Sequence, residues 1–360
     1  MKKKFIAAIS GALALFAFAS CGQTTPPTTF TGSYWNQNTA SETPVGKEEV
    51  IEYKVYSVDE KDGLWNKTQQ NDYLGFKTTT VTDDNGKTLS SRYKTSLVAN
   101  EDGTYLYKTS LTVYGSYEVK TTGDVHDFTD VTETETLFEG INKGFNPIKS
   151  VKTVDNTVPY SSKNGYDFKR TRYTSTINYA DGNAVAKIEI HEGDESGEQF
   201  YERAKKDIEA KNYAKNGYID INLMLLLFRN FKHEANMSYS FKTLEPLSGE
   251  LQSVVGSVYT RTSTEKNSAT YEHLYVCSLK NVLLGAGSPR YDYSFNVVRM
   301  DFSTSGTTGQ TFMRAYYSQG YEGESETNQN SSRHIPVMIA QPTIFNTGFL
   351  VYELDKASFI

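Results

Sequence analysis

Few residues of this chain are spaced so that they could do chemistry, and the clearest pair is Glu189 and His191. In a β-strand, side chains two residues apart lie on the same face, so both residues could reach one metal ion. A catalytic zinc ion needs three protein ligands and a water molecule, and this pair supplies two ligands. We therefore interpret the pair as charges at a solvated strand end, and we predict neither a metal site nor a cofactor.

Two acidic clusters, Glu133/Glu135 and Asp127/Asp130, are the other candidates for catalysis. Hydrolysis of a glycosidic bond needs two carboxylates at a set separation across a cleft, whereas these clusters have the spacing of exposed strand charges. Cys277 stands in an apolar segment, where a free cysteine behaves as a small hydrophobic residue. The sequence therefore predicts no catalytic residue, and a hydrolase with a dispersed site is the least favoured function.

Arg229 and Arg333 are the charges with the greatest potential for binding a ligand. Arg229 follows the apolar run 223–228, in a segment that we expect to be buried. A buried guanidinium must be paired or face a cavity. One interpretation is a structural ion pair with Asp220, Glu245 or a carboxylate of the sheet. The other is an anchor for the anionic group of a ligand, and Arg333 is open to the same two interpretations.

The N-terminus carries a pattern that leads to covalent modification of Cys21. Three lysines at positions 2–4 precede the apolar stretch 5–19, and small residues precede the cysteine. These are the three parts of a secretory signal. Residues 18–21, Phe-Ala-Ser-Cys, resemble the bacterial lipobox, with Phe18 where Leu is usual. We predict that residues 1–20 are a lipoprotein signal peptide and that Cys21 is acylated; the alternative is an ordinary signal peptide cut near Ala19.

The predicted lipid anchor on Cys21 limits where the protein is located and what it can bind. At about 1.5 Å per residue the apolar stretch spans roughly 22 Å, less than a bilayer core of about 30 Å, so we expect no permanent transmembrane helix. We predict an exported, monomeric lipoprotein anchored to a membrane of the cell envelope. Removing residues 1–20 with their three lysines takes the net charge from −6 to −9. Such an acidic body lacks the basic footprint that nucleic acid requires.

Composition and turn signals predict a mainly β fold. The chain has 26 Tyr and 19 Phe, and aromatic residues favour strands. Asn-Gly and Asp-Gly turn signals recur at 83–86, 100–103, 123–124 and 181–183, as in an antiparallel meander. Tyrosines of the strands could line a ligand groove, or they could form cross-strand packing pairs: Tyr105, Tyr107, Tyr114 and Tyr117.

The chain divides into a spacer and a body. Residues 21–46 are rich in Thr and Pro and predict a flexible spacer. Residues 47–360 are expected to form a single β-rich domain, with two sheet lobes, 47–195 and 232–360, as a possible subdivision. Residues 196–231 break the strand pattern and predict one or two helices: Phe200, Tyr201, Ala204 and Ile208 recur at helical spacing, and 219–231 is apolar almost all round, as in a buried helix.

Several short segments occur in an order that is typical of one bacterial family. They are 132–135, 146–148, 220–223, 228–230, 239–241, 271–277, 333–337, 348 and 352–354. This ordered set resembles the exported proteins of domain of unknown function 3108 and their TapB-like relatives, most strongly over residues 218–355. The resemblance implies a strongly bent antiparallel sheet, or half-barrel, packed on one or two helices, and it implies no established reaction.

These expectations lead to one favoured function and one alternative. The favoured function is a membrane-tethered envelope lipoprotein that binds an apolar or amphipathic ligand, such as a lipid or a cell-wall component, in a groove between sheet and helix. The alternative is a surface module that binds a protein or a glycan through loops or sheet edges, with the polar loop 320–332 as the contact. A filled interior would argue against the first.

Overall fold

The structure, a computed structural model, is mostly β-strand, which confirms the mainly β part of the predicted fold class. It describes residues 28–29, 46–58, 71–140, 143, 145–162, 165–193, 200–210, 219–231, 233–245, 250–265, 268–285, 289–304, 311–321, 334–343 and 347–359. Cys21, Arg333, residues 322–332 and all of the predicted spacer except 28–29 and 46 lie outside this part. The predictions for them therefore stay predictions.

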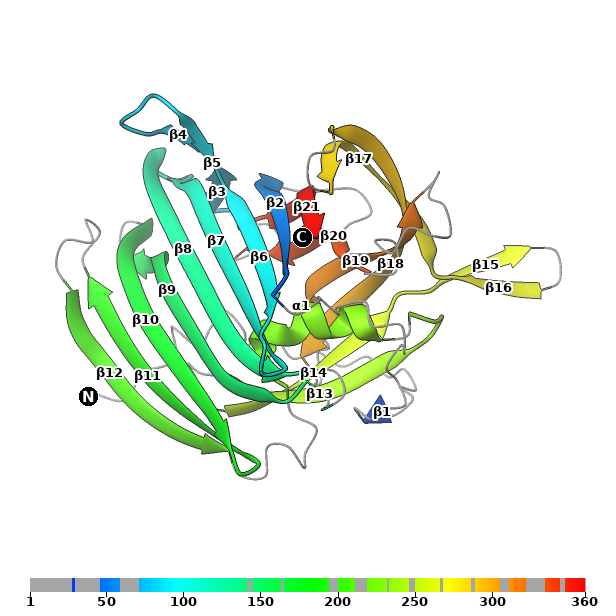
Figure 1. Ribbon diagram of the computed structural model, residues 1–360. Coiled ribbons are helices and arrows are strands. Elements are labelled where there is room, and N and C mark those ends of the chain that lie inside the picture. The colour runs from blue at the N-terminus through cyan, green and yellow to red at the C-terminus, as the bar shows by residue number, and fades with distance from the viewer. Residues whose placement is uncertain are drawn as a thin grey trace.

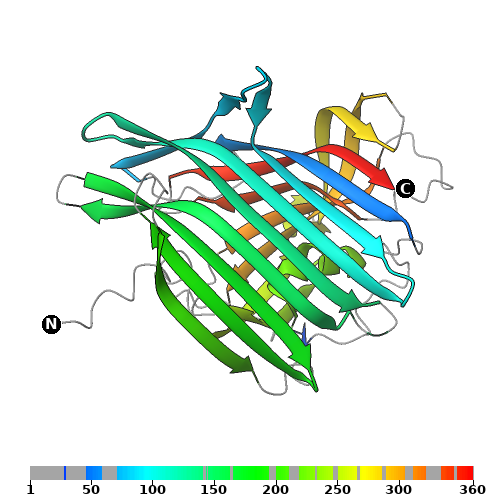
Figure 2. The ribbon, with the colours of Figure 1, turned by 60° about the vertical axis from the view of Figure 1, so that its left-hand side comes forward.

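Seven successive strands form an antiparallel wall in chain order, which Figures 1 and 2 show from two sides. They are β6 (Arg92–Ala99), β7 (Thr104–Val119), β8 (Asp124–Glu139), β9 (Pro147–Ser162), β10 (Gly165–Ala180), β11 (Asn183–Gly193) and β12 (Phe200–Ala210). The predicted turn signals at 100–103, 123–124 and 181–183 join strands of this wall, and the signal at 83–86 joins a separate short hairpin. Gly103 has φ 80°, which glycine adopts without steric cost. The short strand β3 (Leu74–Thr78) pairs with β7, and β4 (Thr80–Thr82), which pairs with β5 (Thr88–Ser90), also contacts β7.

The same sheet continues from β6 into the C-terminal half of the chain. The next strands in pairing order are β2 (Glu48–Val58), β21 (Phe349–Phe359), β20 (Pro336–Pro342), β19 (Thr311–Tyr321) and β18 (Tyr291–Thr304). At β18 the sheet branches to β17 (Leu274–Leu284) and to β14 (Glu250–Val258), which continues to β13 (Ser238–Glu245) and β1 (Thr28–Thr29). The N-terminal strand β2 therefore joins the two predicted lobes directly.

Five C-terminal strands close into a ring. Each of β17, β18, β19, β20 and β21 pairs with the next, and β17 returns to β21 through the register pairs Leu283–Lys356 and Leu284–Ala357. A separate hairpin, β15 (Arg261–Glu265) and β16 (Ser268–Glu272), projects beside β14 and β17 (Figure 1). At the other end of the sheet, Leu244 of β13 packs with Ala210 of β12, so the two sheet ends meet through side chains. The sheet is therefore barrel-like.

A short helical segment lies in the core between the wall and β14, β18 and β19 (Figures 1 and 2). It consists of η6 (Ile221–Leu223), α1 (Met224–Leu227) and η7 (Phe228–Asn230), and the carboxylate of Asp220 accepts a hydrogen bond from the backbone N–H of Asn222 at its start. The buried Phe228 ring meets Phe302 edge-on, with centroids 4.8 Å apart. Among the described residues, no helix has the length and apolar character needed to cross a membrane.

The predicted helix at the start of 196–231 is wrong, because Phe200–Ala210 is strand β12. Ala204 and Ile208 are four residues apart, an interval that fits one face of a helix and equally one face of a strand. In the structure they lie opposite Ile190 and Ala186 of β11. Pairing with β11 decides between the two, because it gives the backbone of this segment a complete set of ladder partners on one side.

Candidate functional site

Arg229 forms a buried ion pair with Glu49 of β2. The guanidinium donates from Nη1 to Oε1 over 2.5 Å and from Nη2 to Oε2 over 2.9 Å, and the side chains are 3% and 2% exposed. Burial lowers the pKa of Arg229, but the Glu49 charge and its hydrogen bonds raise it to above its ordinary value. The structure thus gives Arg229 a carboxylate of the sheet as its partner. This pair balances its charge without a ligand.

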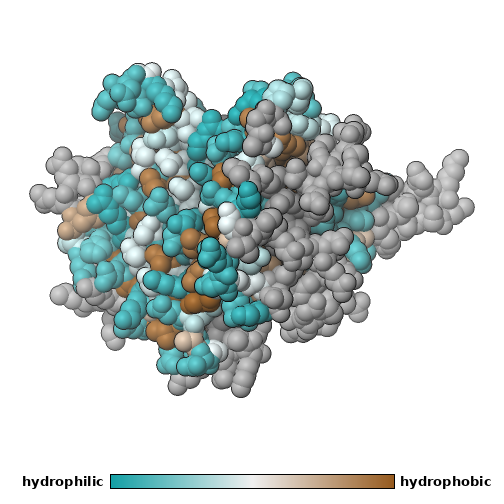
Figure 3. Space-filling view, in the orientation of Figure 1, coloured by the Kyte–Doolittle hydropathy of each residue, from teal (hydrophilic) through white to brown (hydrophobic). Residues whose placement is uncertain are grey.

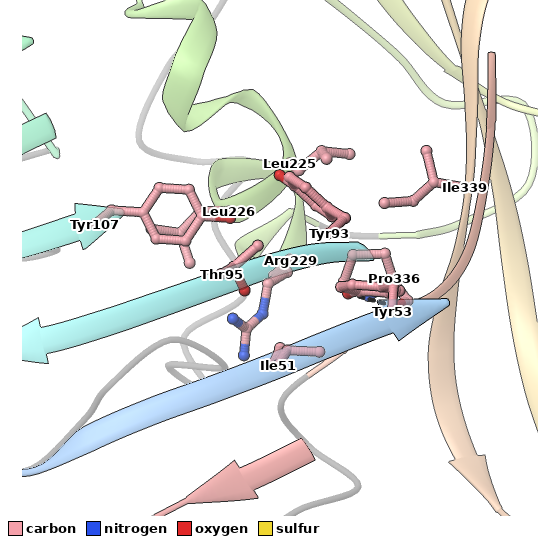
Figure 4. A pocket seen from close by; sticks show the side chains of 10 residues that line it. All are labelled: Ile51, Tyr53, Tyr93, Thr95, Tyr107, Leu225, Leu226, Arg229, Pro336 and Ile339. Carbon is pink, nitrogen blue, oxygen red and sulfur yellow. Dashed lines mark hydrogen bonds between the residues drawn. The ribbon is translucent and has the colours of Figure 1, made fainter. Parts of the chain in front are cut away.

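A small cavity adjoins Arg229 and is lined by side chains from four strands and the helical segment (Figure 4). Its lining residues are Ile51, Tyr53, Tyr93, Thr95, Tyr107, Leu225, Leu226, Arg229, Pro336 and Ile339. The empty space, including its open mouth, is about 240 Å³, and its enclosed part has room for roughly one water molecule. The space between sheet and helix at Arg229 is therefore closely filled.

The tyrosines around this cavity are protonated hydrogen-bond donors. The hydroxyl of Tyr53 donates to the carbonyl oxygen of Pro336 over 2.8 Å, and that of Tyr317 donates to the carbonyl of Leu225 over 3.1 Å. Burial raises the pKa of Tyr107 to about 12 and raises the pKa of Tyr53 well above its ordinary value. These phenols therefore stay neutral at physiological pH: Tyr53 links β2 to the start of β20, and Tyr317 links β19 to the helical segment.

The buried His233 and the half-buried His334 lie near the C-terminal end of the helical segment. His233 Nε2 is 2.8 Å from the carbonyl oxygen of Phe228, and Nδ1 is 2.8 Å from the amide nitrogen of Gln319, so Nε2 donates and Nδ1 accepts. Burial lowers the pKa of His233 to about 3, and His334, with its ring 5.5 Å away, lowers it too. In the part of the chain that the structure describes, no three His, Cys, Asp or Glu side chains are grouped so that they could hold a metal ion.

A different surface, the concave face of β10 and β11, carries unsatisfied polar atoms. Thr171 Oγ1 and Ser175 Oγ are buried and have no hydrogen-bond partner among the described residues. Thr171 is 3% and Ser175 2% exposed. They lie on one face of β10, about 13 Å apart at roughly 3.3 Å per residue. A buried polar group without a hydrogen bond costs about 1–3 kcal/mol, so two such hydroxyls indicate a missing partner.

The strand beside these hydroxyls presents an aliphatic row to the same concave face. Ile188 lies opposite Ser175, and Glu192 lies opposite Thr171. Ala184, Ala186, Ile188 and Ile190 are all buried on this face of β11. Glu192 is paired with Lys169 over 2.7 Å. We call the surface made by Thr171, Tyr173, Ser175, Ile188 and Ile190 the concave patch.

The predicted site residues are scattered over the sheet. Glu189 and His191 lie on the convex face of β11, Glu189 exposed and His191 half-buried, on either side of the buried Ile190. Glu133 and Glu135 are exposed on β8, where Glu135 pairs with Lys108 over 2.8 Å. Cys277 is a half-buried free cysteine on β17. None of these side chains contributes to the concave patch or to the cavity at Arg229.

The predicted tyrosine row forms cross-strand packing pairs at two of its four positions. Tyr105 stacks on Phe138, its direct partner on β8, with ring centroids 5.6 Å apart. Tyr117 stacks on Phe128 at 4.8 Å. Tyr107 lines the cavity at Arg229, and Tyr114 is half-buried on the opposite face of β7. The cross-strand packing interpretation is confirmed for Tyr105 and Tyr117.

On the face seen in Figure 3, the described hydrophobic residues form small groups between hydrophilic ones. Val125 and Tyr201 are exposed on different strands, and Leu274 and Val276 are exposed two residues apart on β17. Scattered exposed apolar residues are normal for protein surfaces. This directs attention to the concave patch.

Comparison with known proteins leaves the chain without a family. No family model matches it, and no curated protein matches it. Among solved structures, it is similar to a beta-barrel-like protein of domain of unknown function DUF1849 from Brucella abortus. The similarity covers 88% of this chain and 99% of that chain, with 9% sequence identity and a TM-score of 0.42. We draw no conclusion about function from so distant a similarity, and the resemblance to family 3108 stays a prediction.

Proposed function

We propose that this chain is a membrane-tethered lipoprotein of the bacterial cell envelope that binds an amphipathic ligand on the concave patch. The signal pattern of residues 1–20 and the Cys21 setting support the tether. The observation that carries the binding proposal is the pair of buried, unsatisfied hydroxyls of Thr171 and Ser175. We place the ligand on β10 and β11 and not beside Arg229, because the space there has room for roughly one water molecule.

The chemistry of the concave patch defines the ligand. Hydroxyls of Thr171 and Ser175 can each donate and accept a hydrogen bond, so they suit a polar group such as an ester, a hydroxyl or an amide. The aliphatic row of β11 suits a hydrocarbon chain lying alongside. Tyr173 stands between the two hydroxyls on the same face of β10, and an aromatic ring with a polar tip contacts both kinds of group.

The first test identifies what the protein carries. The full chain is purified in detergent, extracted with organic solvent and analysed by mass spectrometry. We expect one amphiphile at near-stoichiometric amount besides the acyl chains on Cys21. Titration with lysophosphatidylcholine, a single-chain amphiphile, then measures binding directly. Absence of a co-purifying amphiphile together with no binding of lysophosphatidylcholine would contradict the proposal.

The second test removes the two hydroxyls. In the double variant Thr171→Val with Ser175→Ala we expect binding of the amphiphile to weaken about 10-fold, which corresponds to two neutral hydrogen bonds. The same variant should be more stable than the wild type without ligand, because it no longer buries two unsatisfied hydroxyls. The matched control is Thr174→Val with Thr176→Val, on the opposite face of β10. Equal loss of binding in both double variants would refute the concave patch as the site.

A further inference from the structure

The β15–β16 hairpin leaves the sheet beside a stack of alternating arginine and tyrosine side chains. The guanidinium carbon of Arg299 lies 3.7 Å from the centre of the Tyr259 ring, and that of Arg261 lies 4.6 Å from the centre of Tyr275. The centres of the two rings are 6.2 Å apart. The order along the stack is therefore Arg299, Tyr259, Tyr275 and Arg261. We call these four residues the arginine–tyrosine stack.

The backbone holds the arginine–tyrosine stack in place. Tyr259 follows directly after β14, and its N–H donates to the carbonyl oxygen of Arg299 over 2.9 Å. Tyr275 lies opposite Val297 in the β17–β18 ladder, so its side chain and that of Arg299, two residues further along β18, lie on one face. Strands that are distant in sequence thus fix the rings and both cations.

One carboxylate orients the buried end of the stack. Arg299 is 7% exposed and donates to both oxygens of Asp301, from Nε over 2.7 Å and from Nη2 over 2.6 Å. Arg314 Nε is also within 3.1 Å of Asp301. Nη1 of Arg299 has no hydrogen bond among the described residues, so its two N–H groups are available to a ligand. A guanidinium fixed on one side by a carboxylate is preorganised for a second acceptor.

The hydroxyl of Tyr275 is the second available donor. It is buried and has no hydrogen-bond partner in the described part of the chain. Burial raises its pKa and outweighs the charges of Arg261 and Arg299, which lower it, so the hydroxyl is protonated and can donate. A buried hydroxyl without an acceptor costs free energy. An anion bound beside the two cations would supply the acceptor and form a charge-assisted hydrogen bond with this hydroxyl.

We propose that the arginine–tyrosine stack binds an oxyanion, a carboxylate or phosphate group of a small ligand. Tyr275 donates its hydroxyl hydrogen to the oxyanion, and Arg299 donates from Nη1. Arg261, whose Nη2 also pairs with Glu272 over 3.1 Å at the exposed end of the stack, adds a second guanidinium. Guanidinium groups match the planar geometry of carboxylate and phosphate oxygens. This site is separate from the concave patch and does not depend on the ligand proposed for it.

Calorimetric titration of the full chain in detergent tests the proposal. Sodium phosphate and sodium glucuronate are the probes, with sodium chloride of equal ionic strength as the blank. Binding of phosphate alone assigns a phosphate ligand, binding of glucuronate alone assigns a carboxylate ligand, and binding of both supports a general oxyanion site. The weakest dissociation constant that we expect for this site is roughly 20 mM. If neither phosphate nor glucuronate binds at that concentration, the proposal is overturned.

The variant Tyr275→Phe removes the hydroxyl and keeps the ring. We expect it to weaken binding about 10-fold, because a hydrogen bond to a charged group is lost. Its matched control is Tyr291→Phe, an exposed tyrosine on β18, which should change affinity less than about 2-fold. The thermal midpoint of Tyr275→Phe checks that the sheet is intact. Unchanged affinity in a folded Tyr275→Phe protein overturns the proposed role of Tyr275.

Discussion

The ion pair between Glu49 and Arg229 provides the sharpest test of how this fold is held together. Its side chains are 2% and 3% exposed, and two hydrogen bonds of 2.5 and 2.9 Å join them. The substitution Glu49→Gln keeps the shape of the side chain but leaves the guanidinium buried without a counter-charge. Breaking a buried pair by removing one partner costs about 3–5 kcal/mol. We expect Glu49→Gln to lower the free energy of unfolding by that amount.

The matched control is an ion pair of similar distance on the surface. Lys108 and Glu135 are 2.8 Å apart, and their side chains are 50% and 53% exposed. Solvent screens this pair, so Glu135→Gln should cost no more than about 1 kcal/mol. The comparison between Glu49→Gln and Glu135→Gln isolates the effect of burial.

Urea unfolding followed by intrinsic fluorescence measures both variants, with linear extrapolation to water. A double variant, Glu49→Leu with Arg229→Met, removes both charges and should recover most of the stability that Glu49→Gln loses. If Glu49→Gln cost no more than Glu135→Gln, the guanidinium of Arg229 would be solvated or paired elsewhere. The pair would then not hold β2 to the helical segment in the core.

Three further outcomes follow from the packing and the titrating groups. Gly256→Ala would place a Cβ 2.5 Å from the Phe228 ring and should lower the free energy of unfolding, measured by chemical denaturation, by at least about 2 kcal/mol. In the control Gly75→Ala the Cβ meets no atom closer than 3.6 Å, and the loss should be under about 1 kcal/mol. The pKa of His233 is lower in the folded state, about 3, than in the unfolded chain, so acidification from pH 6.5 towards 3 favours unfolding by up to about 1.4 kcal/mol per pH unit. The variant His233→Gln should lose this slope in urea unfolding at several pH values; an unchanged slope would show that His233 is not responsible. Burial raises the pKa of Asp130 to about 7, so the folded protein binds a proton there more tightly than the unfolded chain does. This difference stabilises the fold as the pH falls from 7 towards 4, the opposite of the His233 effect, and Asp130→Asn should remove it.

Local signals in the sequence predicted the strands of the meander but not their assembly. The Asn-Gly and Asp-Gly turns lie between consecutive strands as expected, because the turn conformation depends on the residues within it. The hairpin β15–β16 was missed, since the sequence between its two strands, Lys-Asn at 266–267, carries no such signal. Helical spacing misled at Phe200–Ala210, where pairing with β11 outweighs local periodicity.

In the candidate sites too, the sequence predicted the kind of residue but not its partner. The sequence identified Arg229 as a buried charge in need of a partner, and nearby acids such as Asp220 were the obvious choices. Its partner, Glu49, is 180 residues away. The concave patch and the arginine–tyrosine stack left no sequence signal, because Thr and Tyr recur along the whole chain and only burial distinguishes Thr171, Ser175 and Tyr275.

The sequence by itself determined the mainly β class, the strand-and-turn rhythm of the wall and the apolar segment that becomes the buried helical turns. These features depend on neighbours along the chain, through backbone propensity and hydrophobic period. Tertiary structure decided that β2 joins the two halves, that β17 closes a ring on β21 and that particular hydroxyls and guanidiniums are buried. Such contacts join residues far apart in the chain, and their free energy depends on water being excluded from both partners at once.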